Sequence, residues 1–294
     1  MLPHAAGFFM QATTGKNIAI VCNTLAGSGR AVMLAETIAE KLTGKDIGHT
    51  IFKEAWPDQF SDFTDIFIVG GDGTLNYFIN RYPGIKLPLV IFKGGTGNDF
   101  HWLLYGIKTL EEQLETALQE EPRPIDMGKC NGRYFINGIG IGFEGEVAKT
   151  LTGKKKHPGK TSFLLTILKK IFTYRSKDYL VNSSNQNLSG KKLLVDITNG
   201  RRAGGGFHIA PQAIADDGLF DIVIVDALSP LQRLRFLPVI EKGKHLHLSF
   251  IHHFRSGSIS VESNELIQYH LDGEYHEDGK LEIKILSGAV KFRC

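Results

Sequence analysis

The sequence predicts a protein of two halves, an N-terminal α/β domain built on a parallel sheet and a C-terminal domain that is mainly antiparallel β. Up to residue 120, short apolar runs alternate with helical patterns, which is typical of a parallel α/β sheet. Beyond residue 125, strand-like runs follow one another across Gly, Asn and Asp turns with few helices between them. A chain of 294 residues, 42% hydrophobic and 22% charged, is long enough for each half to bury a core.

The N-terminal elements repeat one unit of strand, loop and helix. The apolar, β-branched segment 17–22 predicts a strand, and a glycine-containing loop and a helical stretch to about Leu42 follow it. A strand near Ile51 comes next. The later elements of this half are a strand at 66–69, a helix from Leu75, a strand at 89–92 and a helix around 110–120.

The C-terminal half begins after the proline-rich step at 121–124, which predicts the domain boundary. Its expected strands lie at 134–137, 193–197, 220–225, 258–261 and 281–285. A basic amphipathic helix is expected around 160–175, where core packing and docking on a membrane are both compatible with the pattern.

Composition excludes several classes of protein. A net charge of +3 is too weak to indicate nucleic acid, although it suits an anionic ligand or membrane surface. The three cysteines are far apart and odd in number, so we expect no disulfide framework or structural zinc. Residues 1–15 hold only a short apolar patch with no basic segment before it, so we interpret them as a loose leader. These features favour a cytoplasmic protein.

Two glycine-rich segments, 70–76 (GGDGTLN) and 95–100 (GTGNDF), each follow a strand that reads as buried. Open parallel sheets bind ligands at this carboxyl edge, so the pair predicts a nucleotide site. Asp72 can hold a magnesium ion or its water while neighbouring amides and the Thr74 hydroxyl bind phosphate oxygens. Asp72 can also be a turn or capping residue, and Asn98 and Asp99 can equally cap the next helix.

Three further segments have both a functional and a plain structural interpretation. The loop 23–30 can wrap a phosphate, although a glycine turn between strand and helix is more often a simple connection. The segment 215–221 (ADDGLFD) is either an ordinary acidic turn or a cation site. The turn 272–274 (DGE) is either a hairpin turn or the source of a general base, since phosphoryl transfer to an alcohol needs a carboxylate near the attacking hydroxyl.

Together these segments resemble the diacylglycerol-kinase-type lipid kinases, a family that includes bacterial members, sphingosine kinases and ceramide kinases. The resemblance covers nearly the whole chain and rests on ordered blocks. These blocks are 23–30, 70–76, 95–100, 138–147, Asn199 with 204–206, 211–221 and 272–274.

The resemblance implies a nucleotide domain similar to those of phosphofructokinase and NAD kinase, a C-terminal β-sandwich domain, and an active-site cleft between them. It also implies a final strand that returns to the first domain. The expected domains are therefore 1–125 with 287–294, for ATP, and 126–286, for the lipid. ATP would be bound by residues of three loops, namely Asn23, Gly27, Ser28, Gly29, Gly71, Asp72, Gly73, Thr74, Asn76 and Thr96.

The resemblance also implies catalytic and metal-binding roles. Asp72 would organise the catalytic magnesium, and Glu274 with Asp272 would accept the proton of the lipid hydroxyl. A second magnesium ion, away from the transferring phosphate, would be bound by the Asp217 carboxylate and the backbone carbonyls of Ile214 and Leu219.

The chain departs from the family pattern at a few positions. Thr24 stands where the family usually has Pro, Tyr77 where it usually has Glu, and Lys93 where Pro is common. His101 and Trp102 replace the usual Ala-Arg. Tyr77 matters most, because a lost carboxylate beside the nucleotide could alter metal or ribose contacts.

We therefore expect a kinase that uses ATP and Mg²⁺ to phosphorylate a lipid alcohol such as diacylglycerol or a related lipid. Expected partners are the lipid and a peripheral membrane surface, with no nucleic acid, and a homodimer stays an open alternative. Two rival functions are kept: NAD phosphorylation, because NAD kinase shares the Gly-Gly-Asp-Gly signature, and a catalytically weakened nucleotide- or lipid-binding protein.

Overall fold

A computed structural model describes residues 15–152 and 160–294. The expected leader segment, apart from residue 15, lies outside these residues. In the N-terminal half, four parallel strands are ordered β4-β3-β1-β2. They are β1 (Asn17–Cys22), β2 (Gly48–Phe52), β3 (Asp65–Gly70) and β4 (Leu89–Lys93), with a 3-10 turn η1 (Ala26–Gly29) and the helices α1 (Arg30–Thr43), α2 (Asp72–Arg81), α3 (Asp99–Tyr105) and α4 (Leu110–Gln119).

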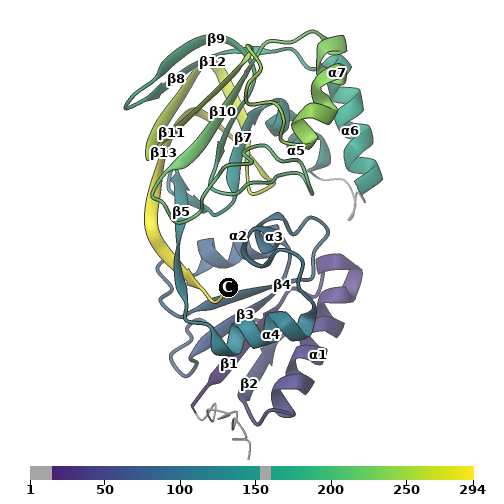
Figure 1. Ribbon diagram of the computed structural model, residues 1–294, viewed down its shortest axis with the longest axis vertical. Helices are drawn as coiled ribbons and strands as arrows, with labels where there is room; N and C mark the ends of the chain where they lie inside the picture. The colour runs from purple at the N-terminus through teal and green to yellow at the C-terminus, as the bar shows by residue number, and fades with distance from the viewer. Residues whose placement is uncertain (1–14, 153–159) are drawn as a thin grey trace, which may run out of the picture.

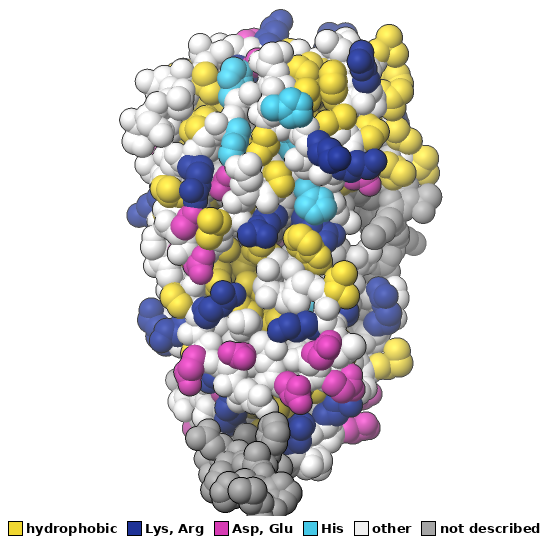
Figure 2. Space-filling model, viewed as in Figure 1, with side chains coloured by type: hydrophobic (Ala, Val, Ile, Leu, Met, Phe, Trp, Pro, Cys, Tyr) yellow, Lys and Arg dark blue, Asp and Glu magenta, His cyan; other side chains and the backbone are white. Residues whose placement is uncertain are grey.

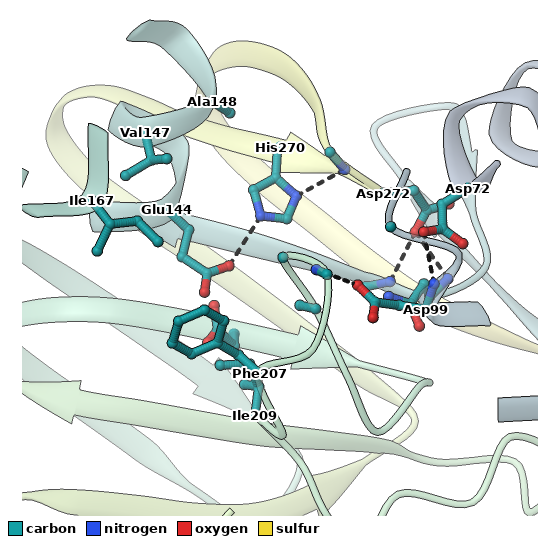
Figure 3. Close-up of a pocket in the computed structure, with 18 of the residues that line it drawn as sticks. Asp72, Asp99, Glu144, Val147, Ala148, Ile167, Phe207, Ile209, His270 and Asp272 are labelled. Carbon is teal, nitrogen blue, oxygen red and sulfur yellow. Dashed lines mark hydrogen bonds and ion pairs between the residues drawn. The ribbon is translucent and has the colours of Figure 1, made fainter. Parts of the chain in front are cut away.

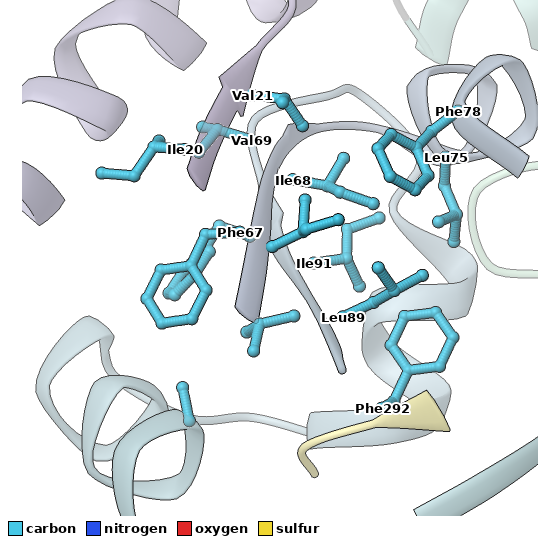
Figure 4. Packing of buried hydrophobic residues seen from close by; sticks show 14 of the residues in the cluster. Ile20, Val21, Phe67, Ile68, Val69, Leu75, Phe78, Leu89, Ile91 and Phe292 are labelled. Atoms are coloured by element: carbon cyan, nitrogen blue, oxygen red, sulfur yellow. The ribbon is translucent and has the colours of Figure 1, made fainter. Parts of the chain in front are cut away.

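The central strands β1 and β3 are apolar after their first residues, Asn17 and Asp65, because helices cover both faces of the sheet. Every residue of β3 is buried. Figure 4 shows Phe67 and Ile68 of β3 with Leu89 of β4 and Phe292 from the C-terminal end of the chain in one cluster. Helices α2 and α3 lie at the end of this half that faces the β-rich half (Figure 1).

The C-terminal half is mainly antiparallel, with three helices along one side of its strands (Figure 1). Its strands are β5 (Arg123–Cys130), β6 (Arg133–Phe135), β7 (Gly138–Gly142), β8 (Lys177–Ser183), β9 (Asn187–Thr198), β10 (Phe220–Asp226), β11 (Ile251–Ser256), β12 (Ser258–Leu271) and β13 (Glu274–Phe292). Its helices are α5 (Phe143–Leu151), α6 (Lys160–Thr173) and α7 (Pro230–Glu241). The predicted fold class, α/β followed by antiparallel β, is confirmed.

Strand β13 connects the two halves. It pairs with β12 and β5 in the C-terminal half, and its last residue, Phe292, pairs with Leu89 of β4 in the parallel sheet. The next residue, Arg293, forms a 2.5 Å ion pair with Asp65 of β3. The C-terminal end of the chain is therefore part of the N-terminal core.

Local differences from the expected elements have simple causes. Helix α2 begins at Asp72 rather than at Leu75, because Gly71 takes the N-cap position and the glycine-rich loop itself forms the first turn. Strands β12 and β13 are longer than expected, because their polar, partly exposed residues still pair across the sheet although they lack an apolar run.

Candidate functional site

A cavity of about 710 Å³ lies between the two halves of the molecule. One end is lined by the glycine-rich loops of the N-terminal half, and the other by apolar side chains of α5, α6, α7 and the β domain. Figure 3 shows Asp72, Asp99 and Asp272 close together at one end, and Val147 and Ile167 at the other. Its volume falls within the range of about 300–1,000 Å³ typical of small-molecule sites.

The cavity brings together most of the site residues expected from the sequence. Of the expected nucleotide and catalytic residues, those that line it are Asn23, Gly27, Gly71, Asp72, Gly73, Thr74, Thr96, Asp272 and Glu274. Ser28, Gly29 and Asn76 are near but do not line it, and the expected second metal site, Ile214, Asp217 and Leu219, lies elsewhere.

The first loop approaches the third too closely for any residue but glycine at position 27. A Cβ on Gly27 would collide with the carbonyl oxygen of Gly94, and the left-handed backbone continues through Ser28 and Gly29. Asn23 fixes the loop: its Oδ1 accepts from the amide of Leu25, and its Nδ2 donates to Thr74 Oγ1 at 3.0 Å. The first and second loops are therefore held together before any ligand binds.

Asp72 joins the second loop to the third. Its carboxylate accepts hydrogen bonds from the amides of Asp99 (2.9 Å) and Phe100 (3.1 Å), the first two residues of α3. Asp72 therefore does act as a capping residue, at the start of α3. Burial and the nearby Asp99 carboxylate raise the pKa of Asp72 from 3.8 to about 6.

Asp272 and Glu274 share a turn but differ in what surrounds them. The Asp272 carboxylate accepts four hydrogen bonds of 2.8–2.9 Å, from Asn76 Nδ2 and from the amides of residues 136, 137 and 138. Burial nevertheless raises its pKa. Four bonds use the accepting capacity of a carboxylate, so Asp272 positions the turn and links it to α2 through Asn76.

Glu274 is the exposed carboxylate of this turn and lines the cavity. Its Oε1 lies 3.3 Å from the point where a Cβ on Gly73 would stand, so it faces the first turn of α2 across the boundary between the halves. A helix N-terminus favours anions such as phosphate. Glu274 therefore lies beside a helix terminus that suits an anion.

The sequence allows Asp99 to belong to the nucleotide loop or to cap the next helix, and the structure shows that it also contacts the C-terminal half. Its Oδ2 accepts from the amide of Gly205 at 2.7 Å, and Arg202 Nη2 lies 3.5 Å from its Oδ1. The Arg202 guanidinium also stacks 4.3 Å from the centre of the Trp102 ring. These contacts join α3 to the C-terminal half, so Trp102, which stands where the family usually has Arg, provides an interdomain contact. His101 instead contacts Gln113 and Tyr105 within the N-terminal half.

Three titratable residues of the apolar end were missed: Glu144, Asp196 and His270 all line the cavity. The signal available in the sequence was a single aspartate inside the otherwise apolar run 193–197 (LLVDI). Burying a carboxylate is costly unless another group pairs with it, so an aspartate at a buried strand position indicates a partner in the protein or in a ligand.

At the expected second magnesium site, the Asp217 carboxylate has contacts within the protein. The Asp217 carboxylate forms an ion pair with the Arg255 guanidinium and accepts a hydrogen bond from the amide of Leu219 at 3.0 Å. Arg255 also approaches Asp221 at 3.5 Å. The guanidinium therefore places a positive charge beside both carboxylates, and the magnesium site stays a prediction.

Tyr77, the main departure from the family pattern, lies outside the cavity lining. Its ring packs edge-on against Trp56 at 5.4 Å, its hydroxyl accepts from Arg81, and 55% of its surface is exposed. Its side chain therefore belongs to the outer surface of α2.

Each half of the chain matches a family model of known proteins. Residues 17–130 match the family model "Diacylglycerol kinase catalytic domain", and residues 137–294 match "YegS C-terminal NAD kinase beta sandwich-like domain". A "Probable lipid kinase YegS-like" of Pseudomonas aeruginosa is 33% identical over 233 residues, which cover 78% of this chain and 76% of that protein. The "Diacylglycerol kinase" of Bacillus subtilis is 28% identical over 219 residues, covering 73% of this chain and 72% of that protein.

Solved structures share the fold. A diacylglycerol kinase structure from Bacillus anthracis aligns with a TM-score of 0.68 at 21% identity, covering 94% of this chain and 96% of that one. An NAD kinase from Archaeoglobus fulgidus in complex with ATP aligns with a TM-score of 0.53 at 14% identity, covering 94% and 93%. At these identities the likeness establishes the fold alone.

Proposed function

Since this chain belongs to the diacylglycerol kinase and YegS-like family of lipid kinases, which are phosphotransferases, we propose that it transfers the γ-phosphoryl group of ATP to a lipid alcohol bound in its cavity. The observation that carries the proposal is the cavity itself. Glycine loops and a helix N-terminus suited to phosphate occupy one end, and an apolar wall suited to acyl chains continues from it.

The residues of the polar end suit phosphoryl transfer, in which catalysis comes mainly from positioning and electrostatics. The first turn of α2 and the loops at Gly27 and Thr96 would hold the phosphates of ATP. Glu274 would accept the proton of the attacking hydroxyl. Asp272 would keep the turn that carries Glu274 at a fixed distance from α2.

Asp72 suits a magnesium ion. Its two hydrogen bonds leave accepting positions on each oxygen. Repulsion from Asp99 and Asp272 contributes to its raised pKa, and a cation would relieve that repulsion. Magnesium is typically held by one or two carboxylates together with substrate phosphates. When bound, it would neutralise charge on the phosphoryl group.

We further propose that the lipid enters from a membrane surface at α6 and α7. Leu165 and Phe172 of α6 are 62% and 58% exposed, and Leu231 of α7 is 75% exposed, while Ile167 of α6 lines the cavity. Figure 2 shows hydrophobic side chains gathered over these helices with basic side chains beside them. Among the described residues, no helix is long and apolar enough to cross a bilayer.

The test is transfer of labelled γ-phosphate from ATP with magnesium, offered a mixed lipid extract together with NAD. We expect label in the organic phase, which also yields the phosphorylated lipid for identification. Label on NAD, or no transfer despite ATP binding, would contradict the proposal and favour NAD phosphorylation or a protein that binds without turnover.

A further inference from the structure

A row of polar residues crosses the floor of the apolar end of the cavity. Strands β12, β7 and β9 are neighbours, and their register places His270 opposite Gly140 and Gly140 opposite Asp196. Residues opposite each other in a sheet share a face, so the two polar side chains flank a position that has no side chain. The Glu144 carboxylate fills this position, since a Cβ on Gly140 would collide with it and with the His270 ring.

His270 and Glu144, two members of this row, are hydrogen-bonded to each other. His270 Nε2 lies 3.0 Å from Glu144 Oε2, and His270 Nδ1 accepts a hydrogen bond from the amide of Gly273 at 3.2 Å. With Nδ1 accepting, Nε2 carries the hydrogen and donates to Glu144. The amide of Gly273 belongs to the turn that carries Glu274, so the row is joined directly to the proposed catalytic turn.

Asp196 has no such partner. It is 1% exposed, it lines the cavity, and neither of its carboxylate oxygens has a hydrogen-bond partner among the described residues. Burial, and then the nearby Glu144 carboxylate, raise its pKa well above the ordinary range. Burying a polar group without a partner is unfavourable, and burying an unpaired charge is more so. A ligand group that donates hydrogen bonds to Asp196 would offset this cost.

Within residues 15–152 and 160–294, no lysine or arginine forms an ion pair with this carboxylate. Arg233 is the only arginine or lysine among the described residues that line the cavity. Its guanidinium donates to the backbone carbonyls of residues 171, 174 and 228. The remaining surroundings include Val147, Ile167 and Phe207, which are apolar.

We propose, on the basis of the lipid-kinase function above, that Asp196 and Glu144 bind the protonated amine of a long-chain amino alcohol, which is the acceptor of the phosphoryl group. An ammonium group brings three hydrogen-bond donors and a positive charge to two carboxylates. A neutral diacylglycerol would instead present ester carbonyls, which only accept. The chain of the amino alcohol would lie against the apolar wall, with its hydroxyl toward Glu274.

The experiment compares kcat/KM for three acceptors: sphinganine, its uncharged derivative N-acetylsphinganine, and dioleoylglycerol. We expect the wild-type protein to favour sphinganine over the other two by about tenfold or more, since a hydrogen bond between charged groups contributes about 1.5–3 kcal/mol. Asp196→Asn keeps the side-chain size and removes the charge. It should lower kcat/KM for sphinganine by about tenfold and change the other two by less than about twofold.

Asp178→Asn is the matched control, because Asp178 is an exposed aspartate near the start of β8, and it should leave all three values unchanged. The Asp196→Asn variant should fold, and its thermal unfolding midpoint should equal or exceed that of wild type, because Asp196 makes no hydrogen bond with the described residues. If that variant does not fold, Glu144→Gln carries the same expectation.

An equal loss for all three acceptors in Asp196→Asn, or a wild-type preference for dioleoylglycerol, would overturn the amine assignment and leave the lipid kinase intact. If no lipid is phosphorylated, the proposed function fails, and the amine site is then judged by calorimetric binding of sphinganine. Binding that weakens about tenfold in Asp196→Asn would support the site, and equal binding would overturn it.

Discussion

At the scale of residues, Asp72, Asp272 and Glu274 each lie in a short glycine-containing segment, but the structure places their carboxylates in different environments. Asp72 caps α3, Asp272 accepts four hydrogen bonds, and Glu274 is left exposed in the cavity. A proton acceptor needs lone pairs that are not already in use. The sequence could only assign the proton-acceptor role to Glu274 and Asp272 together. Their different hydrogen bonding in the structure favours Glu274 for this role.

The proton-acceptor role predicts a specific kinetic loss. Glu274→Gln should lower kcat for lipid phosphorylation by about a hundredfold or more and leave KM for ATP within about twofold, because it removes the base but no phosphate contact. Steady-state assays measure both values. Glu277→Gln is the control, since this nearby glutamate of β13 pairs with Tyr275 and does not line the cavity. Activity of Glu274→Gln within about threefold of wild type would rule out the role.

The buried Asp72 predicts a pH-dependent stability. Folding raises its pKa from 3.8 to about 6, so the folded state binds the proton more tightly. The stability gained from protonation is fully present below pH 3.8 and is lost as the pH rises through about 6. We expect the unfolding free energy of wild type minus that of Asp72→Asn to fall by about 2–3 kcal/mol between about pH 4 and pH 7. Urea unfolding at several pH values measures it, and a difference independent of pH would contradict it.

Tyr77 lies outside the cavity, and this position predicts that the departure from the family pattern is tolerated. Tyr77→Glu should change lipid kinase activity by less than about threefold, because the side chain contacts Trp56 and Arg81 on the outer surface of α2. A large rise in kcat would show instead that the lost carboxylate had weakened the enzyme.

At the scale of elements, the loop 214–221 and strand β11 form an ion-pair cluster. Asp221 of β10 pairs with His253 at 2.7 Å, and Arg255 on the same strand as His253 reaches both Asp217 and Asp221. In the sequence, the acidic segment 215–221 is compatible with a cation site. In the structure, the positive charge next to it is the guanidinium of Arg255, on β11. A residue about 40 positions away in the chain cannot be assigned to the turn from local pattern.

This cluster predicts that the C-terminal half does not depend on magnesium for stability. Removing divalent ions with EDTA should shift the thermal unfolding midpoint by less than about 1 °C, whereas Arg255→Gln should lower it by about 2–4 °C, because breaking this partly exposed pair costs about 1 kcal/mol. Thermal unfolding followed by circular dichroism is the measurement, with Arg175→Gln, on the exposed surface, as the control. A large EDTA effect would show that a metal ion displaces Arg255.

At the scale of the whole molecule, the cavity exists only because the two halves are held in place. Strand β13 returns to the parallel sheet, and Asp99 and Asn76 of the N-terminal half contact Gly205 and Asp272 of the C-terminal half. The apolar end of the cavity lies beneath α6 and α7, whose outer faces carry exposed leucine and phenylalanine.

The exposed face of α6 predicts binding to lipid vesicles. Leu165→Glu with Phe172→Glu should weaken binding to anionic phospholipid vesicles, measured by co-sedimentation, about thirtyfold or more, because each change removes roughly 1–2 kcal/mol of buried apolar contact. Ile107→Glu is the control, since Ile107 is exposed and apolar but lies in the N-terminal half. Equal binding of all three proteins would contradict the proposed membrane contact.

The sequence by itself determined the fold class, the glycine loops and the family, because these depend on local periodicity and on residues a few positions apart. The 70–76 and 95–100 loops are visible in this way, and their glycines are required by close backbone contacts. The tertiary structure alone decided which carboxylate is exposed, where Tyr77 points and which cation pairs with Asp217. It also decided that His270, Glu144 and Asp196 form one row. These relations depend on strand register and on contacts between distant segments, which local pattern does not encode.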